Sequence, residues 1–156
     1  MIWGRGQHNA YTDLIRFHSR WFCAFREGRS ATSADGTVRI LTSFDGLSWE
    51  PVSQIALPGA DLRDPKLSET ADGRLLLNAI EVTFGPPGGQ RRSLGWLSDD
   101  GARWGQANPL AETDWALWRI SWHLGRAYSM AYDAARPAPP RLYTSADGPR
   151  FDLHAG

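Results

Sequence analysis

Charged residues recur at matching places in three segments of this chain that share a hairpin-like pattern. Carboxylates accept hydrogen bonds, and the planar guanidinium of arginine can hold a carboxylate through two parallel bonds. If the three hairpins lie side by side, their charges would converge and form a site. Overlaying the segments by spacing puts Asp13, Asp64 and Arg119 at one shared position and Glu27, Glu81 and Asp133 at another.

Each pair of adjacent charges in these hairpins also has a structural interpretation. Arg26 and Glu27 can form an ion pair on one strand, which would serve no chemistry. Arg63 and Asp64 can likewise form a buried structural pair. From the residues alone, the structural and the functional interpretations both stay open.

Aromatic, thiol and imidazole groups add further candidates. Indole rings can stack on sugar faces, and the last hairpin contains Trp115, Trp118 and Trp122. Trp122 alternates with Ile120, so core packing explains it equally well. The single Cys23 lies between apolar neighbours and is expected to be a buried structural thiol. The four histidines lack the spacing of metal ligands, so we expect neither a metal nor a cofactor.

The elements that must position these residues are short β-strands. β-type runs alternate with turns rich in Gly, Asp, Ser or Pro, and the Pro-Gly segment 85–89 is expected to be an exposed connection. One turn pattern, Ser-x-Asp-Gly-x-x-aromatic, begins at Ser43, Ser98 and Ser145, which are 55 and 47 residues apart. Its Asp can accept hydrogen bonds from turn amides, and its Gly can adopt positive φ.

A repeat of about 50 residues with four strands is typical of a β-propeller. We therefore predict an all-β fold of three four-stranded antiparallel blades at residues 8–60, 61–112 and 113–156. Together they would form one half-propeller over residues 1–156. The first strand of each blade lines the propeller axis, so the charges described above would meet at the axial mouth.

Composition excludes several kinds of partner. Seventeen basic and seventeen acidic residues cancel, which leaves no excess positive charge for nucleic acid or an anionic membrane. No apolar run approaches the roughly 20 residues of a membrane helix. The first ten residues are polar rather than signal-like, so the chain as given is expected to be cytoplasmic.

Several segments resemble one known family. The Ser-x-Asp-Gly-x-x-Trp turns are similar to the Asp-box (BNR) repeats of the sialidase superfamily. Segments 8–14, 25–28, 61–67 and 117–123 resemble bacterial sialidase-like proteins, so the resemblance covers nearly the whole chain. It implies a sialidase-like propeller that acts on glycans, with its site at the axial mouth.

The resemblance also implies roles for individual residues. Members of the family hold the carboxylate of the substrate with three arginines, a task that suits the guanidinium fork. The candidates here are Arg26, Arg63 and Arg119. An Asp donates a proton in this family, and Asp64 or Asp13 could fill that role.

Two further members of the expected site come from the overlay of charges and from the stacking of indole rings on sugars. Glu27 and Trp118 are expected to contribute to substrate binding. The nucleophile of the family is a Tyr paired with a Glu, an exception among glycosidases, and it comes from the second half of the ring. Tyr132 beside Asp133 is the nearest local substitute, although packing is the simpler interpretation. The early Arg-Ile-Pro motif of the family is absent.

Three blades leave two strand-rich faces open to water, and such faces usually find a partner. Two copies joined head to tail would close a six-bladed ring, so we expect a homodimer. Two functions remain open from sequence. One is a sialidase-like glycoside hydrolase, and the other is a non-catalytic propeller that binds glycans or serves as an assembly unit.

Overall fold

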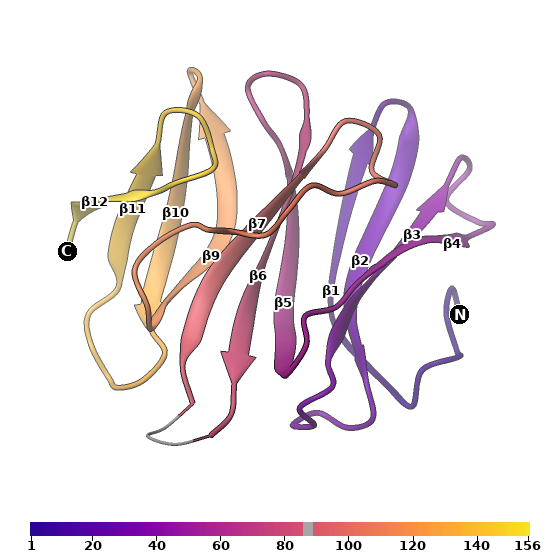
Figure 1. Ribbon diagram of the computed structural model, residues 1–156. Coiled ribbons are helices and arrows are strands. Elements are labelled where there is room, and N and C mark those ends of the chain that lie inside the picture. Colours follow the sequence, from indigo (N-terminus) through magenta and orange to yellow (C-terminus); the bar gives the residue numbers. More distant parts are fainter. Residues whose placement is uncertain (86–88) are drawn as a thin grey trace.

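The protein consists of three antiparallel sheets placed side by side, as the computed structural model shows (Figure 1). The structure describes residues 1–85 and 89–156, so the Pro-Gly segment 85–89 lies partly outside the described residues. Every regular element in the described ranges is a β-strand. The predicted all-β class with three four-stranded antiparallel sheets is therefore confirmed.

Each sheet is a meander whose strands follow the order of the chain. Sheet 1 contains β1 (His8–Phe17), β2 (Arg20–Gly28), β3 (Thr37–Ser43) and β4 (Glu50–Ile55). Sheet 2 contains β5 (Ala60–Glu69), β6 (Leu75–Thr83), β7 (Arg91–Ser98) and β8 (Asn108–Pro109). Sheet 3 contains β9 (Trp115–His123), β10 (Arg126–Asp133), β11 (Arg141–Ser145) and β12 (Asp152–Ala155). The first strands β1, β5 and β9 contact one another in sequence, and we call them the axial strands.

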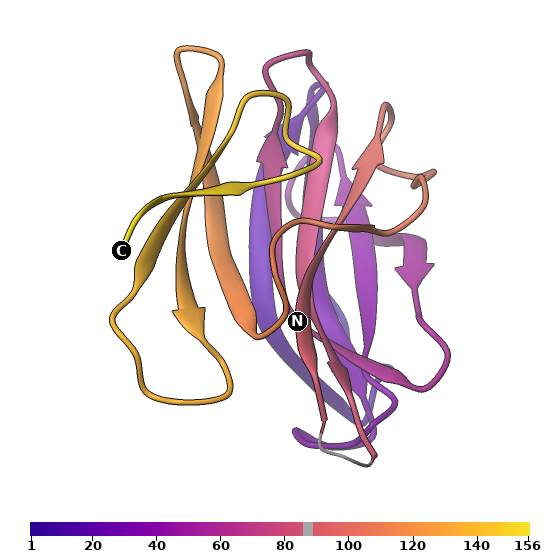
Figure 2. The ribbon, with the colours of Figure 1, turned by 60° about the vertical axis from the view of Figure 1, so that its left-hand side comes forward.

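Apolar side chains fill the two spaces between the sheets. Ala24 and Ile40 of sheet 1 pack against Leu75 and Leu77 of sheet 2, and all four are fully buried. A second cluster joins sheet 2 to sheet 3. Burying one Leu or Ile side chain stabilises a fold by about 1.5–3 kcal/mol, so these clusters are the main force that stacks the sheets. Figure 2 shows sheet 3, in orange to yellow, at one side of the stack.

The outer faces of the stack differ. On sheet 1, the buried Cys23, Phe25 and Leu41 are covered by Trp3 of the N-terminal segment. Cys23 is 1% exposed, which confirms the predicted buried thiol, and burial raises its pKa to about 11. No helix in the described part of the chain is long and apolar enough to cross a membrane.

In all three repeated turns the serine Oγ accepts a hydrogen bond from the glycine amide, and in the first two the Asp also accepts from two backbone amides. In the first, the Asp45 carboxylate accepts from the backbone amides of Leu47 and Ser48, both at 2.8 Å, and Ser43 Oγ accepts from Gly46 N at 2.9 Å. The serine also donates to the Asp in all three turns. Gly46 has a φ of 75°, which a residue with a side chain rarely adopts. The turns therefore act as scaffold elements that connect the third and fourth strands of each sheet.

The Asp45 turn makes the stability of the fold depend on pH. Hydrogen bonds from Ser48, Leu47 and Ser43 lower the pKa of Asp45 to about 2. A lowered folded-state pKa stabilises the protein above the unfolded value of about 4, and this contribution is lost as the pH falls toward about 2. We expect Asp45→Asn to lower the urea midpoint at pH 6, with the difference from the parent closing near pH 2. Asp99→Asn, at an exposed position, is the control, and an Asp45→Asn difference that stays constant with pH would contradict this account.

Candidate active site on the axial strands

Each axial strand contains a β-bulge at the same place. In β1 the bulge residues are Tyr11 and Thr12, in β5 they are Asp64 and Pro65, and in β9 they are Trp118 and Arg119. A bulge inserts an extra residue and re-aims the side chains beside it, and bulges are common next to active sites. Tyr11 and Asp64 have positive φ values of 60° and 49°, a conformation that strains a residue with a side chain.

The bulges correct the overlay made from sequence spacing. Asp64 corresponds to Tyr11 and Trp118, whereas Asp13 lies two positions later and corresponds to Lys66 and Ile120. The predicted equivalence of Asp13, Asp64 and Arg119 is therefore wrong. The error arises because residue spacing does not show where a bulge places two residues of one strand opposite a single residue of its neighbour.

The same registers revise the second predicted position. Glu27 and Glu81 are equivalent, because each lies one pair beyond the bulge. On β10 that place is occupied by Tyr132 rather than Asp133. Asp133 instead accepts hydrogen bonds from Ala135 N and Arg136 N in its own turn, so it is no partner for Tyr132.

The bulges and their neighbours form a group that we call the axial cluster. Lys66 Nζ lies 4.9 Å from the centre of the Trp118 ring, and the rings of Trp118 and Tyr132 meet edge to face at 6.4 Å. The side chains of Trp118, Tyr132 and Tyr11 are 46, 41 and 44% exposed, so the cluster is an open aromatic surface. Its members are Tyr11, Asp13, Asp64, Lys66, Trp118, Arg119 and Tyr132.

Asp13 connects all three axial strands. Its buried carboxylate on β1 accepts a 2.8 Å hydrogen bond from Leu67 N on β5 and forms an ion pair with Arg119 on β9. Both carboxylate oxygens are thus engaged in joining strands. The structure places Asp13 in a positioning role and leaves Asp64 as the candidate acid.

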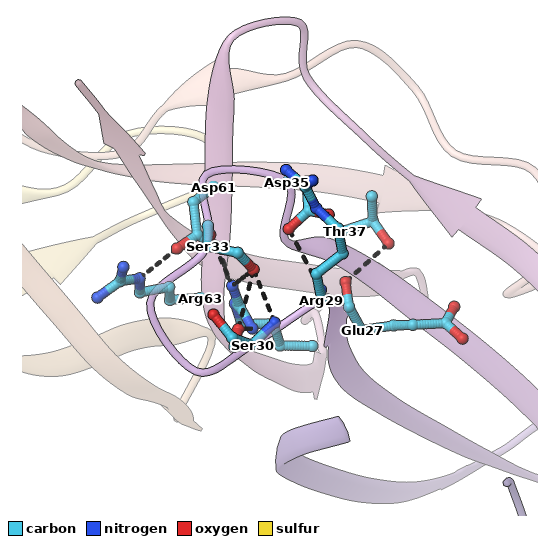
Figure 3. A network of polar contacts seen from close by, with 9 residues as sticks. Glu27, Arg29, Ser30, Ser33, Asp35, Thr37, Asp61 and Arg63 are labelled. Carbon is cyan, nitrogen blue, oxygen red and sulfur yellow. Dashed lines mark hydrogen bonds and ion pairs between the residues drawn. The ribbon is translucent and has the colours of Figure 1, made fainter. Parts of the chain in front are cut away.

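Arg26 is fully buried and is occupied by protein groups. Its Nε donates to Asp61 Oδ1 at 2.7 Å, and its two Nη atoms donate to the carbonyls of Ser30 and Ser33 at 2.9 Å each. The other oxygen of Asp61 accepts from Arg63 Nε at 2.6 Å. Figure 3 shows Ser30, Ser33, Asp61 and Arg63 gathered in this network.

The predicted clamp of three free arginines is therefore absent from the structure. Arg26 has no exposed surface, so it cannot contact a substrate. Arg63 and Arg119 are 23 and 48% exposed, but both are already paired with aspartates. The structural alternative of an ion pair between Arg63 and Asp64 is also wrong, because Arg63 pairs with Asp61. Asp61, which the sequence analysis did not weigh, neutralises two of the three arginines.

Glu27 also has partners of its own. It accepts hydrogen bonds from Trp3 Nε1 at 3.0 Å and Arg39 Nε at 2.8 Å, both on the side of sheet 1 that faces away from sheet 2. The proposed ion pair between Arg26 and Glu27 is thus replaced by pairs with Asp61 and Arg39. Glu27 stabilises the cover of sheet 1, and no contact of the described residues joins it to the axial cluster.

The surroundings of Asp64 disfavour the charged form of its carboxyl. Its side chain is half-buried, and burial is the main cause that raises the pKa of its carboxyl. Lys66 and Arg63 oppose that rise, and Asp61 adds to it. A carboxyl whose pKa is raised keeps its proton closer to neutral pH, which general acid catalysis requires.

Of the three tryptophans considered for sugar stacking, one is available. Trp115 is buried in the core with only 9% exposed, and Trp122 packs against the same cluster, as its alternation with Ile120 suggested. Trp118 is exposed, and its ring contacts Lys66, which lies two residues after Asp64 on β5. Sequence reasoning missed Tyr11 and Lys66 and set Tyr132 aside. A usable signal was present for Lys66, because it is the only lysine in the chain.

Three hollows of the described surface lie beside the three repeated turns. One of about 440 Å³ lies beside the second repeated turn and is lined by Arg74, Arg103 and Trp104, among others. These hollows adjoin scaffold turns whose polar groups are already bonded, so we place the candidate site at the axial cluster. Within the described ranges, no three His, Cys, Asp or Glu side chains are arranged to hold a metal.

Comparison with known proteins identifies the fold. No protein-family model and no curated protein matches the chain. Among solved structures, an α-L-arabinanase from Penicillium chrysogenum bound to arabinobiose is 12% identical, with a TM-score of 0.71 over 94% of this chain and 49% of that one. The Bombyx mori GH32 β-fructofuranosidase BmSUC1 is also 12% identical, with a TM-score of 0.69 over 94% of this chain and 36% of that one.

A third similar structure is an N-acetylgalactosamine deacetylase from F. plautii in complex with blood group B trisaccharide. It is 16% identical, with a TM-score of 0.68 over 94% of this chain and 51% of that one. The chain folds as half of a β-propeller. It spans about half or less of these relatives, and the resemblance at such low identity concerns the fold. The three sheets are thus propeller blades, and the axial cluster lies where the blades meet.

The buried network around Arg26 predicts a large stability effect. Removing one partner of a fully buried ion pair costs about 3–5 kcal/mol, because the other charge stays buried without compensation. We expect Arg26→Met to lower the free energy of unfolding by about that amount in urea titrations. Arg29→Met, which removes a 75% exposed guanidinium from an ion pair with Asp35, should cost less than about 1 kcal/mol. Equal effects of the two changes would refute the structural role of Arg26.

Proposed function

We propose that the half-propeller carries a glycoside-hydrolase site of the sialidase-like kind at the axial cluster, with Asp64 as general acid. The observation that supports it most is the β5 bulge, which holds Asp64 half-buried at positive φ between cations and beside exposed aromatic rings. A strained backbone at a polar, partly exposed residue is common at functional sites. The repeated turns, with their shared Ser-Asp bonds, agree with the Asp-box resemblance.

The arrangement suggests how a bound glycan would react. The exposed Trp118 offers a face for a sugar ring, and the carboxyl of Asp64 would give its proton to the departing glycosidic oxygen. Tyr132 lies near enough for Asp64 to contribute to raising the pKa of its phenol, after burial as the main cause. A phenol with a raised pKa stays protonated, so Tyr132 serves here as a hydrogen-bond donor and ring surface.

Hydrolysis of a fluorogenic sialoside tests the catalytic proposal. General acid catalysis contributes about 10²–10⁴-fold to a rate, so Asp64→Asn should lower the turnover by that factor while the fold, followed by circular dichroism, is unchanged. Asp152→Asn changes an 84% exposed carboxylate and is the matched control. Turnover that persists in Asp64→Asn, or is absent from the parent chain, would refute a role of Asp64 in hydrolysis.

A non-catalytic glycan-binding propeller is the second candidate function, and the open aromatic surface favours it. In that case Trp118→Ala should weaken glycan binding measured by calorimetry. A lost stacking contact is worth about 1 kcal/mol, or roughly fivefold in the dissociation constant. Asp64→Asn should then leave the affinity unchanged. Binding without turnover in the parent chain would support this function over hydrolysis.

We also propose that two copies of the chain join to complete the ring. The outer face of sheet 3 presents Tyr128, Met130 and Leu142, of which Met130 is 48% exposed. In the relatives named above, this length of chain covers about half or less of the protein. A second copy supplies blades of matching shape, and head-to-tail contacts that close give a ring.

Solution mass tests this assembly. We expect light scattering to give a mass near two chains, and Met130→Glu to shift it toward one chain because a charge would be buried at the contact. Leu47→Glu, at an 85% exposed turn position, should leave the mass unchanged. A parent chain that is monomeric at micromolar concentration would refute the two-copy ring.

A further inference from the structure

Lys66 is the only lysine among the seventeen basic residues of the chain. The other sixteen are arginines, which carry the surface charge. The two side chains differ chemically, because the guanidinium stays protonated whereas the amine of lysine can lose its proton and act as a nucleophile. The single side-chain amine of the protein thus lies in the axial cluster.

The surroundings of this amine are unusual for a lysine. Lys66 is only 8% exposed, its Nζ donates one hydrogen bond to the carbonyl of Pro65 at 3.1 Å, and it lies over the ring of Trp118. In the described part of the chain, no carboxylate forms an ion pair with it. Burial of an ammonium without a paired carboxylate favours the neutral form, whereas the face of the Trp118 ring favours the cation.

Charged groups from all three axial strands face Lys66. Burial is the largest cause and lowers the pKa of the amine; Asp13 on β1 and Asp64 on β5 raise it, and Arg119 on β9 lowers it further. The pKa of the amine is lowered overall. Asp13 is already engaged with Arg119 and Leu67 N, which limits what it can offer the amine. Desolvation and a neighbouring cation are the two devices that activate lysine nucleophiles.

We propose that Lys66 is a carbonyl-reactive amine that binds aldehydes covalently. The class of ligand that suits the aromatic surface around it is the open-chain form of a reducing sugar. This inference uses the same surface as the proposed glycosidase but requires no glycosidic bond. It is therefore tested by a separate experiment.

The reaction balances with groups already in the cluster. The neutral amine attacks the carbonyl carbon, the C=O electron pair moves to oxygen, and a proton passes from nitrogen to that oxygen to form a carbinolamine. Asp64, two residues away on β5, can protonate the hydroxyl so that it leaves as water, while the nitrogen lone pair forms the C=N bond of the protonated imine. The Asp64 carboxylate then takes the N–H proton, which leaves the neutral imine and regenerates the acid. Water that returns releases the aldehyde, so the binding is reversible.

Reductive trapping measures this chemistry at single-residue level. The 156-residue chain is incubated with glyceraldehyde and cyanoborohydride between pH 7 and 9.5, and adducts are mapped by peptide mass spectrometry. Arg150→Lys adds an ordinary lysine at an 83% exposed position as an internal reference. The measured quantity is the trapping rate at Lys66 divided by the rate at position 150 in the same molecule. This ratio does not depend on reagent concentration. Its change with pH does not depend on how accessible the two positions are.

We expect the ratio to fall by at least about fivefold between pH 7 and 9.5, because an exposed lysine with a pKa near 10.4 gains neutral amine about tenfold per pH unit while Lys66 saturates earlier. In the Arg150→Lys protein, Lys66→Arg should leave adducts only at Met1 and position 150, and Asp64→Asn should slow trapping at Lys66 but not at position 150. A ratio that is constant with pH, or no adduct at Lys66, would overturn the proposal.

The experiment is separable from the test of hydrolysis. Trapping at Lys66 in a protein that cleaves no sialoside would keep the amine site and count against the glycosidase. If the parent chain shows no adduct at Lys66 and sialoside turnover survives in Lys66→Arg, the glycosidase proposal stands and the amine site is refuted.

Discussion

The buried ion pair between Arg26 and Asp61 is the interaction on which the arrangement of the site depends. It joins a strand of sheet 1 to the first strand of sheet 2, with no exposed surface on either side chain. The same guanidinium holds the carbonyls of Ser30 and Ser33, and the same carboxylate orients Arg63. Buried pairs of this kind fix geometry more than they add stability, because desolvation offsets much of their attraction. Here Asp61 lies three residues before the bulge residue Asp64 on the same strand.

The bulges turn a regular scaffold into a chemical surface. In an uninterrupted ladder, successive side chains alternate between the two sheet faces. An inserted residue breaks that alternation and brings Tyr11, Asp64 and Trp118 to equivalent places on three strands. The positive φ of Tyr11 and Asp64 is the strain that this placement costs, and the apolar clusters between the sheets offset it.

The axial cluster is open because the chain forms only half of a ring. Three blades present one side of an axis, so aromatic rings and charges that would face other blades are open to water. Sheet 1 covers its own outer face with Trp3, whereas Met130 on sheet 3 stays exposed. The two ends of the stack thus differ, because the face of sheet 1 is covered by the chain itself and the face of sheet 3 is open.

Local chemistry determined much of this fold from the sequence alone. The strands, the blade repeat and the thiol of Cys23 follow from composition, spacing and turn residues, all of which act over a few neighbours. The tertiary structure decided which charges meet. Arg26 and Asp61 are 35 residues apart and pair through space, and one inserted residue per axial strand moves Asp64 into line with Tyr11 and Trp118 rather than with Asp13 and Arg119. Strand register and long-range partners are set by packing between sheets, and residue spacing carries no record of either.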